Sequence, residues 1–298
     1  EWSDEVAGAN PLDTIKASID KKYSYLVSNI SLARALNEKF SLGAGLNYIY
    51  MNDATKISKA FASSPATAGL GYTGYSISLE HESSGGALEA TAGFLYKPLE
   101  KLSIGGVFRS GTEITLKGTA KHARKGLTGA GLPDASVESK YEEKYNYPMT
   151  YGLGAAYQLT EKFLISAGFD ANLYSNRKTN VSYTDPAAPF LLDNETSKGH
   201  WKDVYQYRIG AEYAVSDKLD LRGGFYTDPA IIDTDNITLI NTDQYSLNAF
   251  SMGLGYKISD SLNLDANVSY AFSKKLSKDD RDYDYPVVSL RTGVGYSF

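Results

Sequence analysis

Apolar and polar residues alternate with a period of two along most of the chain. In residues 163–173, for example, Phe163, Ile165 and Phe169 stand at odd positions, whereas Asp170 stands at an even one. Successive side chains of a β-strand point to opposite faces, so this pattern predicts strands with one apolar and one polar face. A soluble antiparallel sandwich gives the same alternation, and the period alone therefore leaves the class open.

Five short polar turns interrupt the alternation, each inside a recurring phrase such as YQLTEKFLISAGF at 157–169. We expect these turns at residues 37–39, 99–101, 160–162, 216–218 and 259–261. We expect longer connections at residues 59–74, 121–135, 184–195, 231–242 and 278–285. Short turns that alternate with long loops put all the short turns at one end of the molecule, which is typical of outer-membrane β-barrels.

Three further features favour a membrane barrel over a soluble sandwich. The predicted strands, such as residues 39–58, are much longer than the five or six residues that are usual in soluble sheets. The polar face consists largely of Gly, Ser, Asn and Asp, as a wet or ligand-filled interior requires. Tyr, with 24 copies, is the dominant aromatic residue and clusters at strand ends, where its ring and hydroxyl suit a boundary between lipid and water.

The fold class expected is all-β, a single antiparallel transmembrane barrel domain over residues 1–298. Eleven strands are predicted, at 22–36, 39–58, 75–97, 102–120, 135–158, 163–183, 196–215, 219–230, 243–258, 262–277 and 286–298. Single-chain bacterial barrels have an even number of strands and end at the periplasmic side, so we expect an odd number of strands upstream of residue 1 and a periplasmic C-terminus. The first residues, EWSDEVAGAN, do not resemble a signal peptide, which indicates a processed or shortened chain.

Composition narrows the range of functions. A net charge of −5 gives no electrostatic reason to expect nucleic acid as a partner. No apolar run reaches the length of about 18–20 residues that a membrane helix needs. Cysteine is absent, which fits export through an oxidising periplasm. The location predicted is the bacterial outer membrane, with outer-membrane lipids and surface lipopolysaccharide as partners.

The order of features along the chain resembles the FadL/TodX family of outer-membrane transporters for hydrophobic compounds. The resemblance rests on residues 93–118, on YPMTYGLGAAYQLTEKFLISAGFDANLYS at 147–175, on 201–230 and on SLRTGVGYSF at 289–298. In 201–230 the tract W-K-D precedes Y-R-I-G-A-E-Y and then a D-P pair. The resemblance covers roughly residues 22–298 and implies the last eleven of fourteen strands, with no counterpart of the family's N-terminal hatch. It implies diffusion-driven uptake of hydrophobic small molecules such as fatty acids or aromatic hydrocarbons.

By the same resemblance, a ligand-binding groove lies between the long loops at 59–74 and 121–135. Its apolar candidates are Phe61, Leu70, Tyr72, Tyr75, Leu127 and Leu132. Three basic candidates, His122, Arg124 and Lys125, are placed to meet a carboxylate head group. The alternative interpretation is that the apolar residues only pack the loops together and that the basic residues bind lipid phosphates.

Charged residues on the polar face of the strands are expected to line the lumen. The lumen candidates are Arg109, Asp170, Arg208, Arg222 and Arg291. Because both signs occur on this face, we expect many of these groups to pair across neighbouring strands. The alternative is that Arg109, Arg208 and Arg291 bind a carboxylate ligand inside the barrel.

Two other classes remain open on the sequence, a general porin for small polar solutes and a purely structural barrel. A porin needs no apolar groove and predicts a constriction lined by separated charges. An enzyme is not expected, because His81, His122 and His200 lie in no nucleophile, acid–base or metal-ligand motif. We expect no cofactor and no metal, a hydrophobic small molecule as ligand, and a monomer.

Overall fold

The computed structural model describes residues 2–7, 14–62, 74–126, 133–184, 195–197, 200–232, 246–273, 276–278, 281–283 and 286–296. Within these residues the chain forms eighteen β-strands. Sixteen of them join one antiparallel sheet, and β16 and β17 pair separately as a hairpin. None of the described residues belongs to a helix that could cross a membrane.

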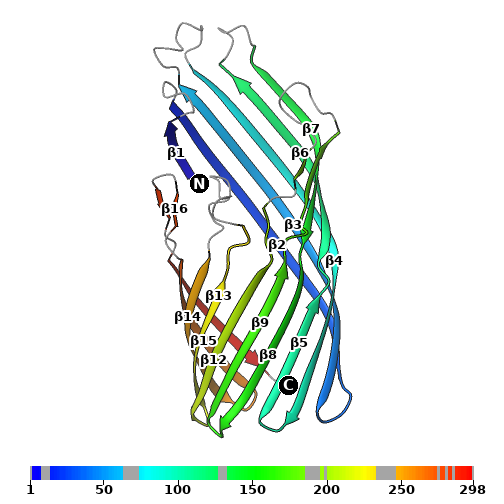
Figure 1. Cartoon of the computed structure of the whole chain (residues 1–298), viewed down its shortest axis with the longest axis vertical. Helices are drawn as coiled ribbons and strands as arrows, with labels where there is room; N and C mark the ends of the chain where they lie inside the picture. The colour runs from blue at the N-terminus through cyan, green and yellow to red at the C-terminus, as the bar shows by residue number, and fades with distance from the viewer. Residues whose placement is uncertain are drawn as a thin grey trace.

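The bounds of the strands follow the order of the chain (Figure 1). They are β1 (Trp2–Ala7), β2 (Thr14–Ala35), β3 (Phe40–Ala62), β4 (Gly74–Leu99), β5 (Leu102–Arg109), β6 (Thr112–Lys125), β7 (Ala135–Tyr147), β8 (Met149–Thr160), β9 (Phe163–Leu173), β10 (Thr179–Tyr183), β11 (Glu195–Ser197), β12 (Val204–Ser216), β13 (Leu219–Asp228), β14 (Leu247–Ser259), β15 (Leu262–Ser273), β16 (Leu276–Lys278), β17 (Arg281–Tyr283) and β18 (Val287–Tyr296).

Eleven consecutive passes make up the sheet from β2 to β18, as the sequence predicts. They are β2, β3, β4, β5 with β6, β7 with β8, β9 with β10, β11 with β12, β13, β14, β15 and β18. The prediction that the first strand begins at residue 22 is wrong, because β2 begins at Thr14. Its first residues, 14–19, pair with β1 as an additional hairpin. The outer positions of that stretch carry Lys16, Ser18 and Asp20, so they lack the apolar row by which lipid-facing strands are recognised.

The five short turns all lie at one end of the sheet, at the bottom of Figure 1. The strand ends leave residues 36–39, 100–101, 161–162, 217–218 and 260–261 as the turns, which confirms the predicted positions to within a residue or two. The last strand, β18, also ends toward this side, and the C-terminus is drawn there. Every long connection therefore starts and ends at the opposite end.

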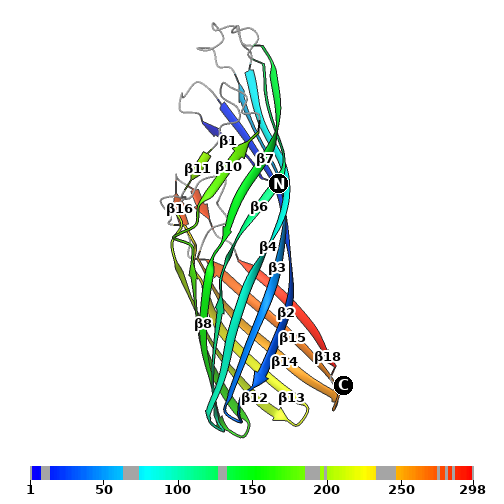
Figure 2. The same cartoon turned by 90° about the vertical axis from the view of Figure 1, so that its right-hand side faces the viewer.

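The sheet is strongly curved, and it has two free edges. Neighbouring strands pair in order from β2 through β18, but no described residue of β18 pairs with β2. Seen from the side, the strands β2, β3, β4, β6 and β7 rise well above the rest (Figure 2). We call β6, β7, β10, residues 14–29, 47–62 and 74–89 the upper wall, and the remainder of the sheet the lower wall.

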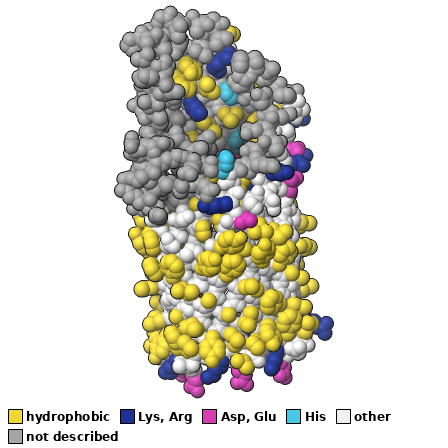
Figure 3. Space-filling model, viewed as in Figure 1, with side chains coloured by type: hydrophobic (Ala, Val, Ile, Leu, Met, Phe, Trp, Pro, Cys, Tyr) yellow, Lys and Arg dark blue, Asp and Glu magenta, His cyan; other side chains and the backbone are white. Residues whose placement is uncertain are grey.

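An apolar band covers the outer face of the lower wall, with charged side chains along its lower rim (Figure 3). Tyrosines such as Tyr96, Tyr157 and Tyr213 face outward at the turn end, and Tyr48 and Tyr151 face outward at the other edge of the band. This is the lipid-facing surface with two aromatic belts that a transmembrane barrel presents. Its aliphatic members include Ile30, Leu32, Leu46, Leu88, Leu153, Ile165, Ile209, Leu221, Met252, Val268, Leu290 and Val294.

Four neighbouring passes shift the phase of their alternation by one residue at a common height. In β5 the inward residues are odd-numbered, as Arg109 is, whereas in β6 the inward and buried ones, such as Ile114 and Leu116, are even-numbered. The shift falls at residues 110–111, at Pro148, at 174–178 and between β11 and β12. The predicted uninterrupted strands 102–120, 135–158, 163–183 and 196–215 are therefore wrong in this respect, since each contains two strands.

Gly111 and Pro148 explain how two of these passes accommodate the shift. Gly111 has a φ of 64°, a conformation that glycine adopts without steric cost. Pro148, which interrupts β7 and β8, has no N–H to contribute to a ladder and is found at such irregularities in sheets.

Candidate functional site on the inner face of the sheet

The side chains opposite the apolar band form the inner face, and in the lower wall they are small and polar. One row across five strands consists of Ser166, Gly210, Gly224, Ser251 and Ser269. A lumen surface of this kind holds water or a ligand rather than a packed core, as the sequence predicts.

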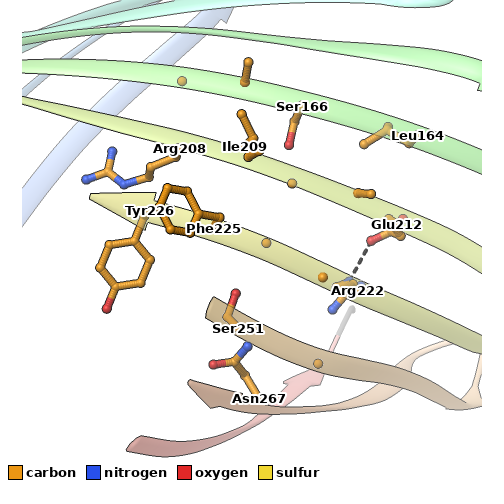
Figure 4. A pocket seen from close by; sticks show the side chains of 17 residues that line it. Leu164, Ser166, Arg208, Ile209, Glu212, Arg222, Phe225, Tyr226, Ser251 and Asn267 are labelled. Atoms are coloured by element: carbon orange, nitrogen blue, oxygen red, sulfur yellow. Dashed lines mark hydrogen bonds and ion pairs between the residues drawn. The ribbon is translucent and has the colours of Figure 1, made fainter. Parts of the chain in front are cut away.

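Two groups of paired charges cross the inner face of the lower wall. Arg208 forms an ion pair with Asp170 on the neighbouring strand. Arg222 donates from Nε to Glu212 Oε2 at 2.6 Å and from Nη1 to Asp265 Oδ1 at 2.5 Å. Figure 4 shows Arg208 at one end and the Arg222–Glu212 pair at the other end of a groove of about 450 Å³. The expected pairing of lumen charges is thus confirmed for Arg208 and Arg222.

Arg109 and Arg291 differ from these two arginines. Within the described part of the chain, neither makes a hydrogen bond or an ion pair, and both are exposed on the inner face. Arg109 lies across from Thr91 and Thr150. Arg291 lies opposite Asn267. Of the predicted lumen arginines, these two have guanidinium groups available to a ligand.

Glu89 is a buried carboxylate where the upper and lower walls meet. Only 2% of the surface of Glu89 is exposed. Asn29 Nδ2 donates to Asn47 Oδ1 at 2.7 Å, and Asn47 Nδ2 donates to Glu89 Oε2 at 2.6 Å. The second oxygen, Oε1, has no hydrogen-bond partner among the described residues. Because an unsatisfied buried acceptor is costly, Glu89 is a polar position of the inner face that packing alone does not explain.

Directly above Glu89, the inner face of the upper wall becomes apolar. Ile49 and Met51 of β3 pack with Ile114 and Leu116 of β6, and all four are nearly inaccessible. The backbone of β6 comes close to β4 at Gly85, where a Cβ would collide with the carbonyl oxygen of Thr115. Ala87, Tyr145 and Tyr147 complete the cluster.

The next layer of the upper wall combines aromatic rings with charged groups. Tyr141 stacks on His81, with ring centroids 4.9 Å apart, and its hydroxyl donates to Glu143 Oε2 at 2.5 Å. His81 Nε2 lies 3.5 Å from Asp53 Oδ1. Burial, together with the negative charge of Glu143, raises the pKa of Tyr141 far above its usual range. The tyrosine is therefore a neutral hydrogen-bond donor at any physiological pH.

The predicted basic group does not form one exposed patch. The prediction that His122 lies in a loop is wrong, because β6 continues to Lys125. His122 and Arg124 point inward and Lys125 outward, since they alternate along β6. His122 is 8% exposed with no partner for Nδ1 among the described residues, and burial and the charge of Arg124 lower its pKa. Arg124 Nη2 donates to the carbonyl of Pro133 at 3.2 Å.

Two of the predicted apolar ligand residues come together at the top of the upper wall. Phe61 and Tyr75 are register partners on β3 and β4, and their rings stack with centroids 4.3 Å apart and planes 12° apart. Both face inward above the layers just described. The other four apolar candidates, Leu70, Tyr72, Leu127 and Leu132, lie outside the described residues.

Sequence reasoning missed most of the upper wall's inner residues. One of them is Arg177, whose guanidinium lies 3.9 Å from the ring centroid of Tyr145 and 4.0 Å from that of Trp201. A cation between two aromatic faces ties the irregular segment 174–178 to the neighbouring passes. The sequence does contain a sign that the strands are interrupted below the upper wall. The Ser-Gly pair at 110–111 and Pro148 break an otherwise uniform alternation. No group of three His, Asp or Glu side chains suited to a metal occurs in the described part of the chain.

Taken together, the long antiparallel strands, the apolar outer band and the polar inner face define an outer-membrane β-barrel transport protein. The profile of the outer membrane protein transport protein family (OMPP1/FadL/TodX) matches residues 15–297. The chain belongs to this family.

Individual relatives are distant in sequence but similar in fold. A 47 kDa outer membrane protein of Pasteurella multocida is 24% identical over 196 residues, which span 62% of this chain and 43% of that protein. A Pseudomonas aeruginosa FadL homologue has a TM-score of 0.66 at 14% identity, covering 96% of this chain and 74% of that one. The Ralstonia pickettii toluene transporter TbuX has a TM-score of 0.61 at 15% identity, with 96% and 78% covered. The chain thus spans less than half the length of the curated relative.

Proposed function

We propose that the protein is a channel for the diffusion-driven uptake of hydrophobic small molecules, such as fatty acids or aromatic hydrocarbons, across the bacterial outer membrane. The observation that carries this proposal is the stacked pair of aromatic rings, Phe61 and Tyr75, at the top of the inner face. Below these rings, Ile49, Met51, Ile114 and Leu116 pack together on the same face, on the side where a channel for polar solutes carries hydrophilic groups. The toluene transporter with a similar fold supports an apolar cargo.

The layers of the inner face suggest a route for the molecule. It is captured by the stacked rings of Phe61 and Tyr75, passes the Tyr141 layer and the apolar cluster, and reaches the polar lower wall below Glu89. Apolar surfaces that line only part of the path allow a ligand to bind and then to leave. Arg109, at the start of the lower wall, is available to a carboxylate if the cargo has one.

The proposed orientation places the short turns and the C-terminus in the periplasm and the upper wall outside the cell. This orientation follows the general rule that outer-membrane barrels have short periplasmic turns and longer extracellular loops. The protein functions without catalysis, cofactor or metal in this proposal, and as a monomer.

The capture step can be tested with the double variant Phe61→Ala/Tyr75→Ala. Burying one aromatic or aliphatic side chain against a ligand contributes about 1.5–3 kcal/mol, so losing two rings should lower affinity for a hydrophobic ligand at least about tenfold. Uptake of toluene and of oleate by cells, and leakage of arabinose from proteoliposomes, would be measured on the same protein.

A matched control removes an aromatic pair from the outer face. Phe169 and Tyr205 stack there with ring centroids 5.8 Å apart, so Phe169→Ala/Tyr205→Ala should leave hydrophobic uptake unchanged. If Phe61→Ala/Tyr75→Ala takes up both hydrophobic ligands at the normal rate, the proposal is wrong. A polar-solute porin would instead show large arabinose flux that changes when Arg109 or Asp170 is replaced.

A further inference from the structure

The outer face of the upper wall carries a polar groove just above the apolar band. Register aligns Ser24, Asn52, Ser84 and Lys117 in one row across β2, β3, β4 and β6. The row below it contains Leu26 and Tyr50 on β2 and β3. The outer face thus changes from apolar to polar within a single row, at the height where a lipid head group would lie.

The groove has a floor of mostly hydroxyl and amide groups, with Glu82 beside them, between two lysines. Its volume is about 460 Å³, and its lining includes Lys22, Ser24, Asn52, Ser84 and Lys117. Serine hydroxyls and the asparagine amide supply both donors and acceptors. Glu82 is the only carboxylate among its outward-facing described lining residues, and Asp20 and Glu142 stand beside its two lysines.

Each of the two ammonium groups forms an exposed ion pair that an anion could replace. Lys22 Nζ lies 3.5 Å from Asp20, and Lys117 Nζ lies 3.4 Å from Glu142, while the lysine side chains are 79% and 72% exposed. Exposed ion pairs of this kind contribute little to stability. A phosphate that accepts hydrogen bonds from an ammonium group forms a stronger, charge-assisted contact.

We propose that this groove binds the phosphorylated sugar head group of lipopolysaccharide in the outer leaflet. The amide and hydroxyl floor suits a sugar, the flanking lysines suit its phosphates, and the apolar band below continues along the acyl chains. The outer leaflet is the leaflet that meets this height of the wall in the proposed orientation. The site lies on the opposite face of the sheet from the uptake route, so it is independent of the transported molecule.

The test compares two pairs of lysines on the purified full chain in nanodiscs. Lys22→Gln/Lys117→Gln alters the groove, and Lys121→Gln/Lys140→Gln removes two lysines on the same face outside it. Binding of Kdo2-lipid A would be measured by native mass spectrometry, against the same lipid without phosphates. Each lysine near an anionic lipid surface is worth about 1 kcal/mol, so the groove variant should bind about 10- to 30-fold more weakly.

The expected result is that the groove variant and the dephosphorylated lipid each lose affinity, while the control variant binds normally. All four lysines are exposed, so the variants should fold, as the heat-dependent electrophoretic shift of barrels will report. Equal affinity of the two lysine variants would overturn the proposal. Equal binding of phosphatidylglycerol would also overturn it, because that result indicates only general attraction to anionic lipid.

Discussion

Val268 and Ser269 provide the sharpest test of the two faces of the sheet. They are neighbours in β15, but Val268 pairs with Met252 and Leu290 on the outer face, whereas Ser269 pairs with Ser251 and Ser289 on the inner face. An arginine on the lipid face near the bilayer midplane costs about 2–4 kcal/mol. The same arginine at position 269 enters a wet lumen and should cost less than about 1 kcal/mol.

The expected difference of about 2–3 kcal/mol corresponds to a change of roughly 30- to 150-fold in the folding equilibrium. Val268→Arg and Ser269→Arg would be unfolded with guanidinium in lipid vesicles, with the folded fraction read from electrophoretic mobility. Both variants add the same side chain to the same strand, so differences in strand propensity and chain length cancel. If the two variants lose equal stability, or if Ser269→Arg loses more, the assignment of lipid and lumen faces is refuted.

Three further predictions concern the inner face. Arg222→Met leaves Glu212 and Asp265 unpaired in the lumen, so reconstituted channels should become more cation-selective, which a reversal potential in a salt gradient will show; an unchanged potential would place these groups outside the permeation path. His122 has a pKa lowered from 6.5, so the unfolded chain binds a proton more readily, and the stability of the upper wall is full above about pH 6.5 and falls as the pH drops below it. Hydrogen exchange of β6 at about pH 7.5 and about pH 5 should show this loss, and His122→Asn should abolish it. Gly85→Ala should cost about 1–3 kcal/mol through overpacking, whereas Gly293→Ala, with its nearest neighbour atom at 4.0 Å, should be nearly neutral in the same unfolding titration.

The lower wall was predictable from the sequence because lipid imposes one chemical rule on every second residue. In a run such as 262–272 every second residue is apolar without interruption. The positions of the turns follow from where this alternation ends. The upper wall obeys no such rule on its outer face, where Lys117 and Glu142 pair with each other. The alternation there is carried only by inward residues such as Ile114 and Leu116, and it is out of phase with the strand below.

The candidate site was predictable only in part, for a related reason. Alternation identifies which face Arg208 and Arg222 occupy, but only the register of the strands shows that each arginine meets a carboxylate while Arg109 does not. The burial of His122 depends on β6 extending five residues beyond its predicted end, from 120 to Lys125. Contacts between strands that are distant in sequence, such as Asn47 with Glu89, leave no local pattern.

The shared phase shift has a consequence for how proteins of this architecture can change. Below the shift, inserting or deleting one residue would turn a strand's lipid-facing side chains into the lumen, so the two faces fix the length of each strand there. Above the shift, the alternation in the four passes has a different phase from that of the strands below. In two of these passes the change of phase is accommodated at Gly111 and Pro148. The upper wall can therefore be lengthened, shortened or re-lined in evolution while the lower wall, with its apolar outer band, keeps its pattern.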